Sequence, residues 1–222
     1  MKSMGKDAKM NDLTGSLVFS VILLTTILGE FVLPWILKHF YKGYNSKTMV
    51  MSVLGSPESP VRIIYNVWLV WLGAFLLFTS ILLFEVINAV SSILAILTLI
   101  SISAFAIGAG ILSGLFSVNE SKEKVTAASK IHGAGSALGF MALLFFPLLW
   151  GIFSFGSGDI IQGAVCVTSF ALAVLFFVFF IMGDKEKFKE TAFSNAGLWE
   201  RLSLFFMYVP FLYIAIYNLL IF

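Results

Sequence analysis

Four long stretches without a charged side chain constrain this chain more than any other feature. Each has about 20 residues or more, the length that an α-helix needs to cross the hydrocarbon core of a bilayer. They are Ile63–Phe84, Val86–Asn119, Ile160–Gly183 and Leu202–Phe222. Only 12% of all residues are charged, whereas soluble domains carry about 25%. The sequence therefore predicts a polytopic membrane protein of the all-α class.

Six segments are predicted to cross the membrane as helices, in one bundle that forms a single domain over residues 1–222. A bilayer offers the backbone no hydrogen-bond partners, so each span has to satisfy its own groups as a helix. A short polar tail, residues 1–14, precedes the first span, and the charged loop 184–197 is predicted to form a solvated or interfacial helix. The expected spans are about 16–37, 62–84, 89–116, 131–153, 160–183 and 198–220.

The connector between the first two spans is the most polar long segment of the chain. Residues 41–66 read YKGYNSKTMVMSVLGSPESPVRIIYN and are rich in turn formers, hydroxyl groups and charge. Loops longer than about 12–15 residues are usually functional or disordered. Met49, Met51, Val53 and Leu54 make this one too apolar for a disordered linker. We therefore expect an ordered cap, partly embedded in the membrane, at the mouth of the bundle.

The basic residues are distributed unevenly between the two sides of the predicted bundle. The side of the first, third and fifth connectors carries eleven: Lys38, Lys42, Lys47, Arg62, Lys122, Lys124, Lys130, Lys185, Lys187, Lys189 and Arg201. The other side carries three, Lys2, Lys6 and Lys9 in the tail. Because Lys and Arg are enriched in cytoplasmic loops, the large connectors are predicted to be cytoplasmic and both termini to lie outside.

Polar side chains open the even-numbered spans on the same side as the first connector: Asn66, His132 and the pair Glu200–Arg201. Such groups are costly at membrane depth, so they mark a site or a water-filled cavity, or they snorkel to the surface. Glu30 lies about two turns inside the first span and should be protonated, paired or facing a cavity. The candidate ligand-binding residues are Glu30, Ser52, Ser56, Arg62, Asn66, His132, Glu200 and Arg201.

Evidence for catalysis or a metal is weak. The two histidines, His39 and His132, form no metal-binding motif, and a zinc site needs three or four ligands. No metal and no cofactor are therefore expected. Ser52, Ser56, Ser59 or Ser117 could pair with His132, but the G-x-S-x-G spacing of a nucleophile elbow does not occur. His132 remains the candidate general base if the protein is an enzyme. A net charge of +2 does not suggest a nucleic-acid partner.

Two pairs of glycines lie four residues apart, Gly110 with Gly114 and Gly135 with Gly139. Small residues at this spacing let helix backbones approach closely, so both pairs are predicted to seat the third and fourth spans together. A homodimer face is the alternative. On this hypothesis Gly135→Leu and Gly139→Leu should be more damaging than Gly73→Leu.

The first connector, the segments LFSVNES and KIHGAGSALGF, and the later GLWERL resemble a known pattern. The chain is similar to the bacterial membrane-protein family labelled "domain of unknown function 998". The resemblance implies six helices, a first connector ending in an S-x-L-G turn, an asparagine opening the second helix and a histidine opening the fourth. The family's S-D-L-G form has an acid where this chain has Val53. The matching positions are Ser52, Leu54, Gly55, Asn66, His132 and Arg201.

These features together favour a non-enzyme that binds or moves a small amphiphile or lipid through a polar pocket at its cytoplasmic face. Arg62 and Arg201 would attract an anionic head group. One alternative is a lipid-modifying enzyme with His132 as general base, and another is a non-catalytic subunit of a second membrane protein. The expected partners are membrane lipids, a small amphiphilic ligand or a membrane protein. The resemblance places the protein in the inner membrane of bacteria.

Overall fold

The computed structural model describes residues 16–119, 125–183 and 185–221, which contain helices and turns and no strand. Six of these helical segments are long and apolar enough to cross a membrane, which confirms the predicted all-α fold class. They are Leu17–Phe40, Arg62–Asn88, Ser92–Leu115, Ala127–Gly156, Ile160–Gly183 and Ala196–Ile221. The first connector is ordered between the first two, as expected.

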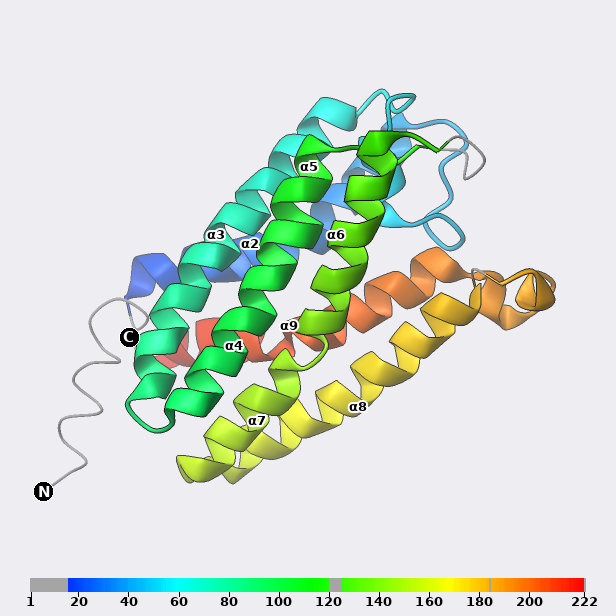
Figure 1. Ribbon diagram of the computed structural model, residues 1–222. Helices are drawn as coiled ribbons and strands as arrows, with labels where there is room; N and C mark the ends of the chain where they lie inside the picture. The colour runs from blue at the N-terminus through cyan, green and yellow to red at the C-terminus, as the bar shows by residue number, and fades with distance from the viewer. Residues whose placement is uncertain (1–15, 120–124, 184, 222) are drawn as a thin grey trace, which may run out of the picture.

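Three spans stand side by side on one side of the bundle (Figure 1). The third span consists of α4 (Ser92–Phe105), a π-helical segment η3 (Ala106–Leu112) and α5 (Ser113–Leu115). It packs against α3 (Arg62–Asn88) and against α6 (Ala127–Leu143). The remaining helices, α2 (Leu17–Leu37), α7 (Phe146–Gly156), α8 (Ile160–Gly183) and α9 (Ala196–Ile221), complete the bundle, with α9 in contact with the other three.

The fourth span is longer than predicted and is broken in the middle. It begins at Ala127 because Thr126 and Ser129 form a reciprocal capping box, with bonds of 3.1 and 2.9 Å. It breaks at Leu144 and Phe145, just before Pro147. Proline has no N–H and clashes with the preceding turn, so it starts a new helix more easily than it continues one. The break separates α6 from α7.

Glycines bring the second, third and fourth spans into backbone contact. A β-carbon at Gly108 would overlap the carbonyl of Gly135, and one at Gly139 would lie 3.1 Å from the backbone nitrogen of Ala109. Gly135 and Gly139 thus seat the fourth span on the third, as expected. Gly110 and Gly114 instead face α3, against Gly73 and Asn66, so that part of the prediction is wrong.

Gly73 is at least as tightly packed as the glycines of the fourth span. A β-carbon there would overlap the carbonyl oxygen of Ala106 and lie 2.8 Å from the backbone nitrogen of Ile111, whereas one at Gly135 would lie 3.0 Å from its nearest neighbour. The expectation that Gly73→Leu is the mildest of the three substitutions therefore rests on a wrong premise. The error arose because Gly73 has no glycine four residues away in the sequence.

The charged loop between α8 and α9 forms two short 3₁₀ turns, η4 (Glu186–Phe188) and η5 (Ala192–Ser194), in place of the predicted helix. The hydroxyl of Thr191 donates to the carbonyl of Phe188 and accepts from the backbone of Phe193. Such side-chain bonds compete with the helical ladder, so the chain turns at Thr191.

A candidate site at the basic end of the bundle

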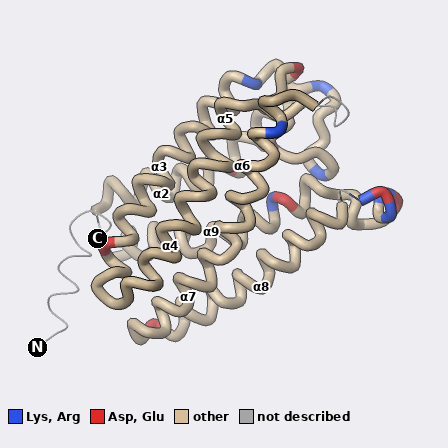
Figure 2. The backbone as a smooth tube through the Cα atoms, in the orientation of Figure 1, with Lys and Arg blue, Asp and Glu red and all other residues tan. Residues whose placement is uncertain are grey.

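One end of the bundle carries every Lys and Arg of the described residues (Figure 2). These are Lys38, Lys42, Lys47, Arg62, Lys130, Lys185, Lys187, Lys189 and Arg201. Glu85 lies near the end of α3, at the other end of that helix from Arg62, and Asp159 lies in the turn between α7 and α8, toward the opposite end of the bundle. Lys122, Lys124 and the three lysines of the tail lie outside the described residues. We call the lysine- and arginine-bearing end the basic end.

Arg201 ties the first connector to the start of α9. Its Nη1 donates to the carbonyls of Ser46 (2.8 Å), Met49 (3.3 Å) and, within the helix, Gly197 (2.6 Å). Its Nη2 donates to the hydroxyl of Tyr44 at 2.6 Å. The planar guanidinium has five N–H donors in a fixed arrangement, which suits it to hold several carbonyls of one loop.

Tyr44 links Arg201 to a further part of the connector, because the Tyr44 hydroxyl donates to the carbonyl of Val50 at 3.1 Å. Burial raises the pKa of Tyr44 to about 12. The phenol is therefore neutral at physiological pH, so it can accept from Arg201 and donate to Val50 at the same time.

Glu200 and Glu30 bring two carboxyl groups inside the bundle. Glu200 is 6% exposed and accepts a 2.7 Å bond from the backbone N–H of Met51, in the short helix η2 (Met51–Gly55) of the connector. Glu30, on α2, is 3% exposed and accepts a 2.7 Å bond from the indole N–H of Trp68 on α3. Both Glu200 and Arg201 interact electrostatically with Glu30.

Asn66 and His132 form a second group, around the end of the third span. The Nδ2 of Asn66 donates to the carbonyl of Gly55 (3.3 Å) and to the hydroxyl of Ser117 (3.1 Å). The Nδ1 of His132, a residue that is 5% exposed, lies 2.9 Å from the carbonyl oxygen of Phe116. That carbonyl follows α5, where a helix leaves its last C=O groups without partners. His132 thus caps the end of the third span.

The candidate residues are therefore divided between two clusters. Glu30, Glu200 and Arg201 lie where α2, α9 and the connector meet, whereas Asn66 and His132 each bond to the segment Phe116–Ser117. Both clusters touch η2, through Met51 and Gly55. Ser56 is fully buried and its hydroxyl has no hydrogen-bond partner among the described residues; Ser52 is half-buried on η2.

A shallow groove of about 520 Å³ runs beside α3 at the basic end. Arg62 lies at its polar end, and Asn66 forms part of its wall. The other lining residues are apolar or glycine: Ile63, Val67, Val70, Gly114 and Leu115. A β-carbon at Gly114 would lie 2.6 Å from the carbonyl oxygen of Asn66, so the glycine allows α5 to approach α3 along the groove.

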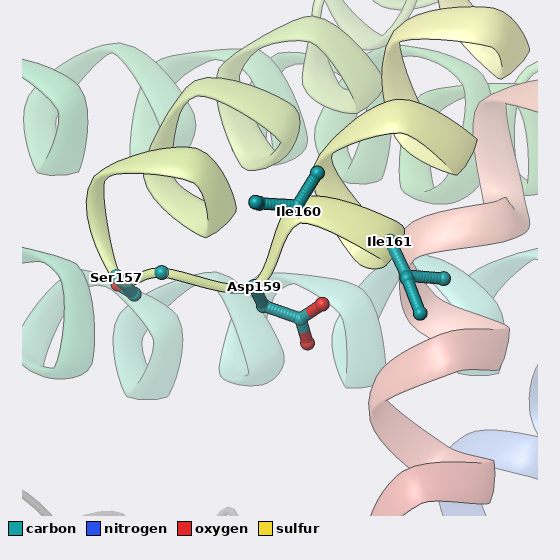
Figure 3. A pocket seen from close by; sticks show the side chains of 5 residues that line it. Ser157, Asp159, Ile160 and Ile161 are labelled. Carbon is teal, nitrogen blue, oxygen red and sulfur yellow. The ribbon is translucent and has the colours of Figure 1, made fainter.

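A second hollow, of about 540 Å³, lies near the opposite end, in the turn between α7 and α8 (Figure 3). Ser157, Gly158, Asp159, Ile160 and Ile161 line it. The carboxylate of Asp159 accepts from the backbone of Gln162 at 2.9 Å, and the hydroxyl of Tyr213 donates to it at 3.3 Å. Asp159 thus caps the start of α8, which gives this turn a structural role.

Two partners of the candidate residues were not found by sequence reasoning, Tyr44 and Trp68. Ser117 was named only as a possible partner of His132, whereas the structure bonds it to Asn66. Trp68 follows Asn66 by two residues, near the start of α3. The signal that could have identified it is the unpaired carboxylate of Glu30, which requires a donor from a neighbouring helix. Within residues 16–119, 125–183 and 185–221, no three His, Cys, Asp or Glu side chains are grouped closely enough to hold a metal ion.

Comparison with known proteins gives one match. The model of a family described as "Protein of unknown function (DUF998)" matches residues 27–217. No curated protein and no solved structure matches the chain.

Proposed function

Because the chain belongs to the DUF998 family, whose description assigns no activity, we propose from the geometry alone that it binds an anionic amphiphile in the groove beside α3. The protein is a six-helix, multi-pass membrane protein. The ligand class we propose is a membrane lipid or lipid-like molecule with a negatively charged head group. The observation that carries this proposal is the groove's combination of one cationic end with apolar walls.

The cationic end is the guanidinium of Arg62, at the first residue of α3. Arg62 is exposed and forms no ion pair or side-chain hydrogen bond with another described residue. An exposed arginine can bind a phosphate or carboxylate with two parallel hydrogen bonds. Arg201, the other expected head-group ligand, is occupied by the connector carbonyls and Tyr44. Arg62 is therefore the better candidate for the head group.

The apolar walls follow from the helical repeat. Ile63, Val67 and Val70 lie three or four residues apart and thus on one face of α3. Val67 is 64% exposed and Ile63 is 76% exposed, so these side chains are not used in packing the bundle. At 1.5 Å per residue, the lined face from Arg62 to Val70 extends about 12 Å from the polar end. This length fits the upper part of an acyl chain.

The groove is open to the surroundings of the helices rather than enclosed, which favours a ligand that arrives through the bilayer. We propose that the basic end faces the cytoplasm of a bacterial cell, because the described Lys and Arg residues gather there. The anionic lipids of the cytoplasmic leaflet would then lie beside Arg62.

Catalysis by His132 receives less support from the geometry. Its Nδ1 is 2.9 Å from a backbone carbonyl, and its side chain is nearly fully buried. The ring is thus bonded to the end of the third span, and His132 is not one of the residues that line the groove. A general base needs access to a substrate proton.

The test is lipid binding to the purified protein, measured by native mass spectrometry with an anionic phospholipid and with phosphatidylcholine. Arg62→Gln should reduce binding of the anionic lipid, and Lys130→Gln, which removes a charge at the same end but outside the groove, should not. Val67→Trp should fill the groove and weaken binding of both lipids, whereas Ile81→Trp on the exposed part of α3 should weaken neither. Equal binding by Arg62→Gln and Lys130→Gln would contradict the proposal.

A further inference from the structure

Two carboxyl groups share the interior of the bundle with one guanidinium. Glu30 on α2 and Glu200 on α9 are 3% and 6% exposed, and these two helices pack against each other (Figure 1). Each carboxyl accepts one hydrogen bond from a neutral donor, the indole of Trp68 or the backbone of Met51. Arg201 interacts electrostatically with both carboxyl groups.

The charges of this cluster do not balance when both carboxyl groups are ionised. One guanidinium and two carboxylates give a net charge of −1. Arg201 also directs its N–H groups to carbonyls and to Tyr44, so it forms no direct hydrogen bond with either carboxylate among the described residues. An uncompensated buried charge is costly in a low-dielectric interior. The cluster therefore favours the uptake of one cation.

We propose that Glu30 and Glu200 form a membrane-embedded site for one exchangeable proton. In the uptake step, a hydronium ion in the water at the basic end gives one proton to a carboxylate oxygen of Glu30 and is left as neutral water, and the net charge of the cluster changes from −1 to 0. Release reverses this step. The site is separate from the lipid-binding groove and does not depend on it.

A proton fits this site better than a metal ion. Sodium and calcium ions bind through several oxygen ligands at once, and one oxygen of each carboxylate already accepts an N–H group. The described residues hold no third acidic side chain beside the pair. Protonation requires a single oxygen and no rearrangement of the helices.

The titratable and hydrogen-bonding groups that face Glu30 come from two helices. From α3 they are Trp68 and Tyr65, and from α9 they are Glu200, Arg201 and Tyr208. Tyr44 of the connector interacts with Tyr65. Lys38 and His39 of η1 (Lys38–Phe40) lie against Trp35 instead, and η2 contributes no titratable side chain.

Tyr208 is an independent indication that a polar ligand belongs here. It is fully buried, and its hydroxyl has no hydrogen-bond partner among the described residues. It interacts electrostatically with Glu30, and its ring packs 6.1 Å from that of Phe31. A buried hydroxyl without a partner is unusual, and its position beside Glu30 equips the site with an additional donor and acceptor for a mobile proton.

Trp68 provides a built-in optical probe of this site. Excitation moves electron density away from the indole nitrogen, so a carboxylate hydrogen-bonded to that nitrogen lowers the emission energy. The experiment titrates the tryptophan fluorescence of the full chain in lipid nanodiscs, and subtracts the titration of Trp68→Phe to remove the other four of the 5 tryptophans. The wild-type difference signal should shift to shorter wavelength in a single one-proton step as the pH falls.

Matched variants assign the step. Glu30→Gln keeps an acceptor for Trp68 and should abolish the step. Glu200→Gln removes the neighbouring negative charge, so the midpoint should move to lower pH. Glu85→Gln, an exposed carboxyl near the opposite end, should leave the midpoint unchanged. A step that persists in Glu30→Gln, a pH-independent Trp68 signal, or a midpoint that depends on the sodium concentration would overturn the proposal.

If Glu30→Gln does not fold, infrared difference spectroscopy of the wild-type protein tests whether a buried carboxyl group takes up a proton. The carbonyl stretch of a protonated buried carboxyl group should appear on acidification and shift in D₂O. Its absence across the range in which the protein stays folded would contradict the proton site.

Discussion

The amide of Asn66 lies directly against Gly55, so that a β-carbon at position 55 would overlap its Oδ1. The Nδ2 of the same amide donates to the carbonyl of Gly55 at 3.3 Å. Gly55 ends the S-x-L-G turn, and Asn66 opens the second span. The two positions thus form one contact, which fixes η2 against α3 beside the groove that Arg62 and Asn66 line.

Gly55→Ala should therefore destabilise the protein, because the methyl group displaces Asn66 and weakens its bonds to Gly55 and Ser117. The expected loss in the free energy of unfolding is about 1–3 kcal/mol, as for other overpacked sites. Denaturant titration in detergent measures it. Gly133→Ala is the matched control: a β-carbon there would meet no atom within 4 Å. In a helix, that substitution should raise stability by up to about 1 kcal/mol. Equal effects of the two substitutions would contradict this account.

Arg201→Lys should loosen the first connector without unfolding the bundle. A lysine ammonium cannot reproduce the bonds to Ser46, Met49 and Tyr44, because it lacks the extended planar arrangement of donors. Amide hydrogen exchange should increase by at least about tenfold over residues 44–51, which corresponds to a loss of about 1.4 kcal/mol of local stability. Arg62→Lys serves as control and should leave exchange in the connector unchanged. Unaltered exchange in Arg201→Lys would show that the contact does not hold the connector.

How much of this arrangement the sequence could predict depends on the range of the interactions. The six spans follow from local composition, since apolar length alone decides whether a helix can cross a bilayer. The break before Pro147 follows from the proline itself, whereas the close packing of Gly73 depends on a neighbouring span. The polar residues at the starts of the spans were identifiable because charge is rare in this chain. Their division into two clusters was not, since it depends on how η2 folds between them.

His132 shows the same limit, and it leads to a different expectation from the one drawn from sequence. If His132 lined a cavity, it would contribute little to folding, and His132→Ala would affect function more than stability. The ring instead caps the carbonyl of Phe116, and removing a partner of a buried polar group costs about 1–3 kcal/mol. We expect His132→Ala to lower the unfolding free energy by that amount, with partial rescue in His132→Gln. An unchanged unfolding midpoint for His132→Ala would restore the cavity hypothesis.

The orientation can be tested by cysteine labelling in intact cells after Cys166→Ala removes the native thiol. Asn45→Cys, in the first connector, should be protected from a membrane-impermeant reagent. Asn88→Cys, at the end of α3, should react with it. Both side chains are exposed. Asn45 lies in the connector before α3 and Asn88 lies at the far end of α3, so the two positions are on opposite sides of the predicted membrane. The reverse pattern of labelling would place the basic end outside the cell.

The most direct test of lipid binding is an experimental structure of the protein extracted with its native membrane lipids. We predict density for a negatively charged head group within hydrogen-bond distance of the Arg62 guanidinium, continued by a chain along Val67, Val70 and Leu115. A groove without lipid density, or one filled by a helix of another protein, would contradict the proposed function, and the second result would identify the protein as a partner subunit.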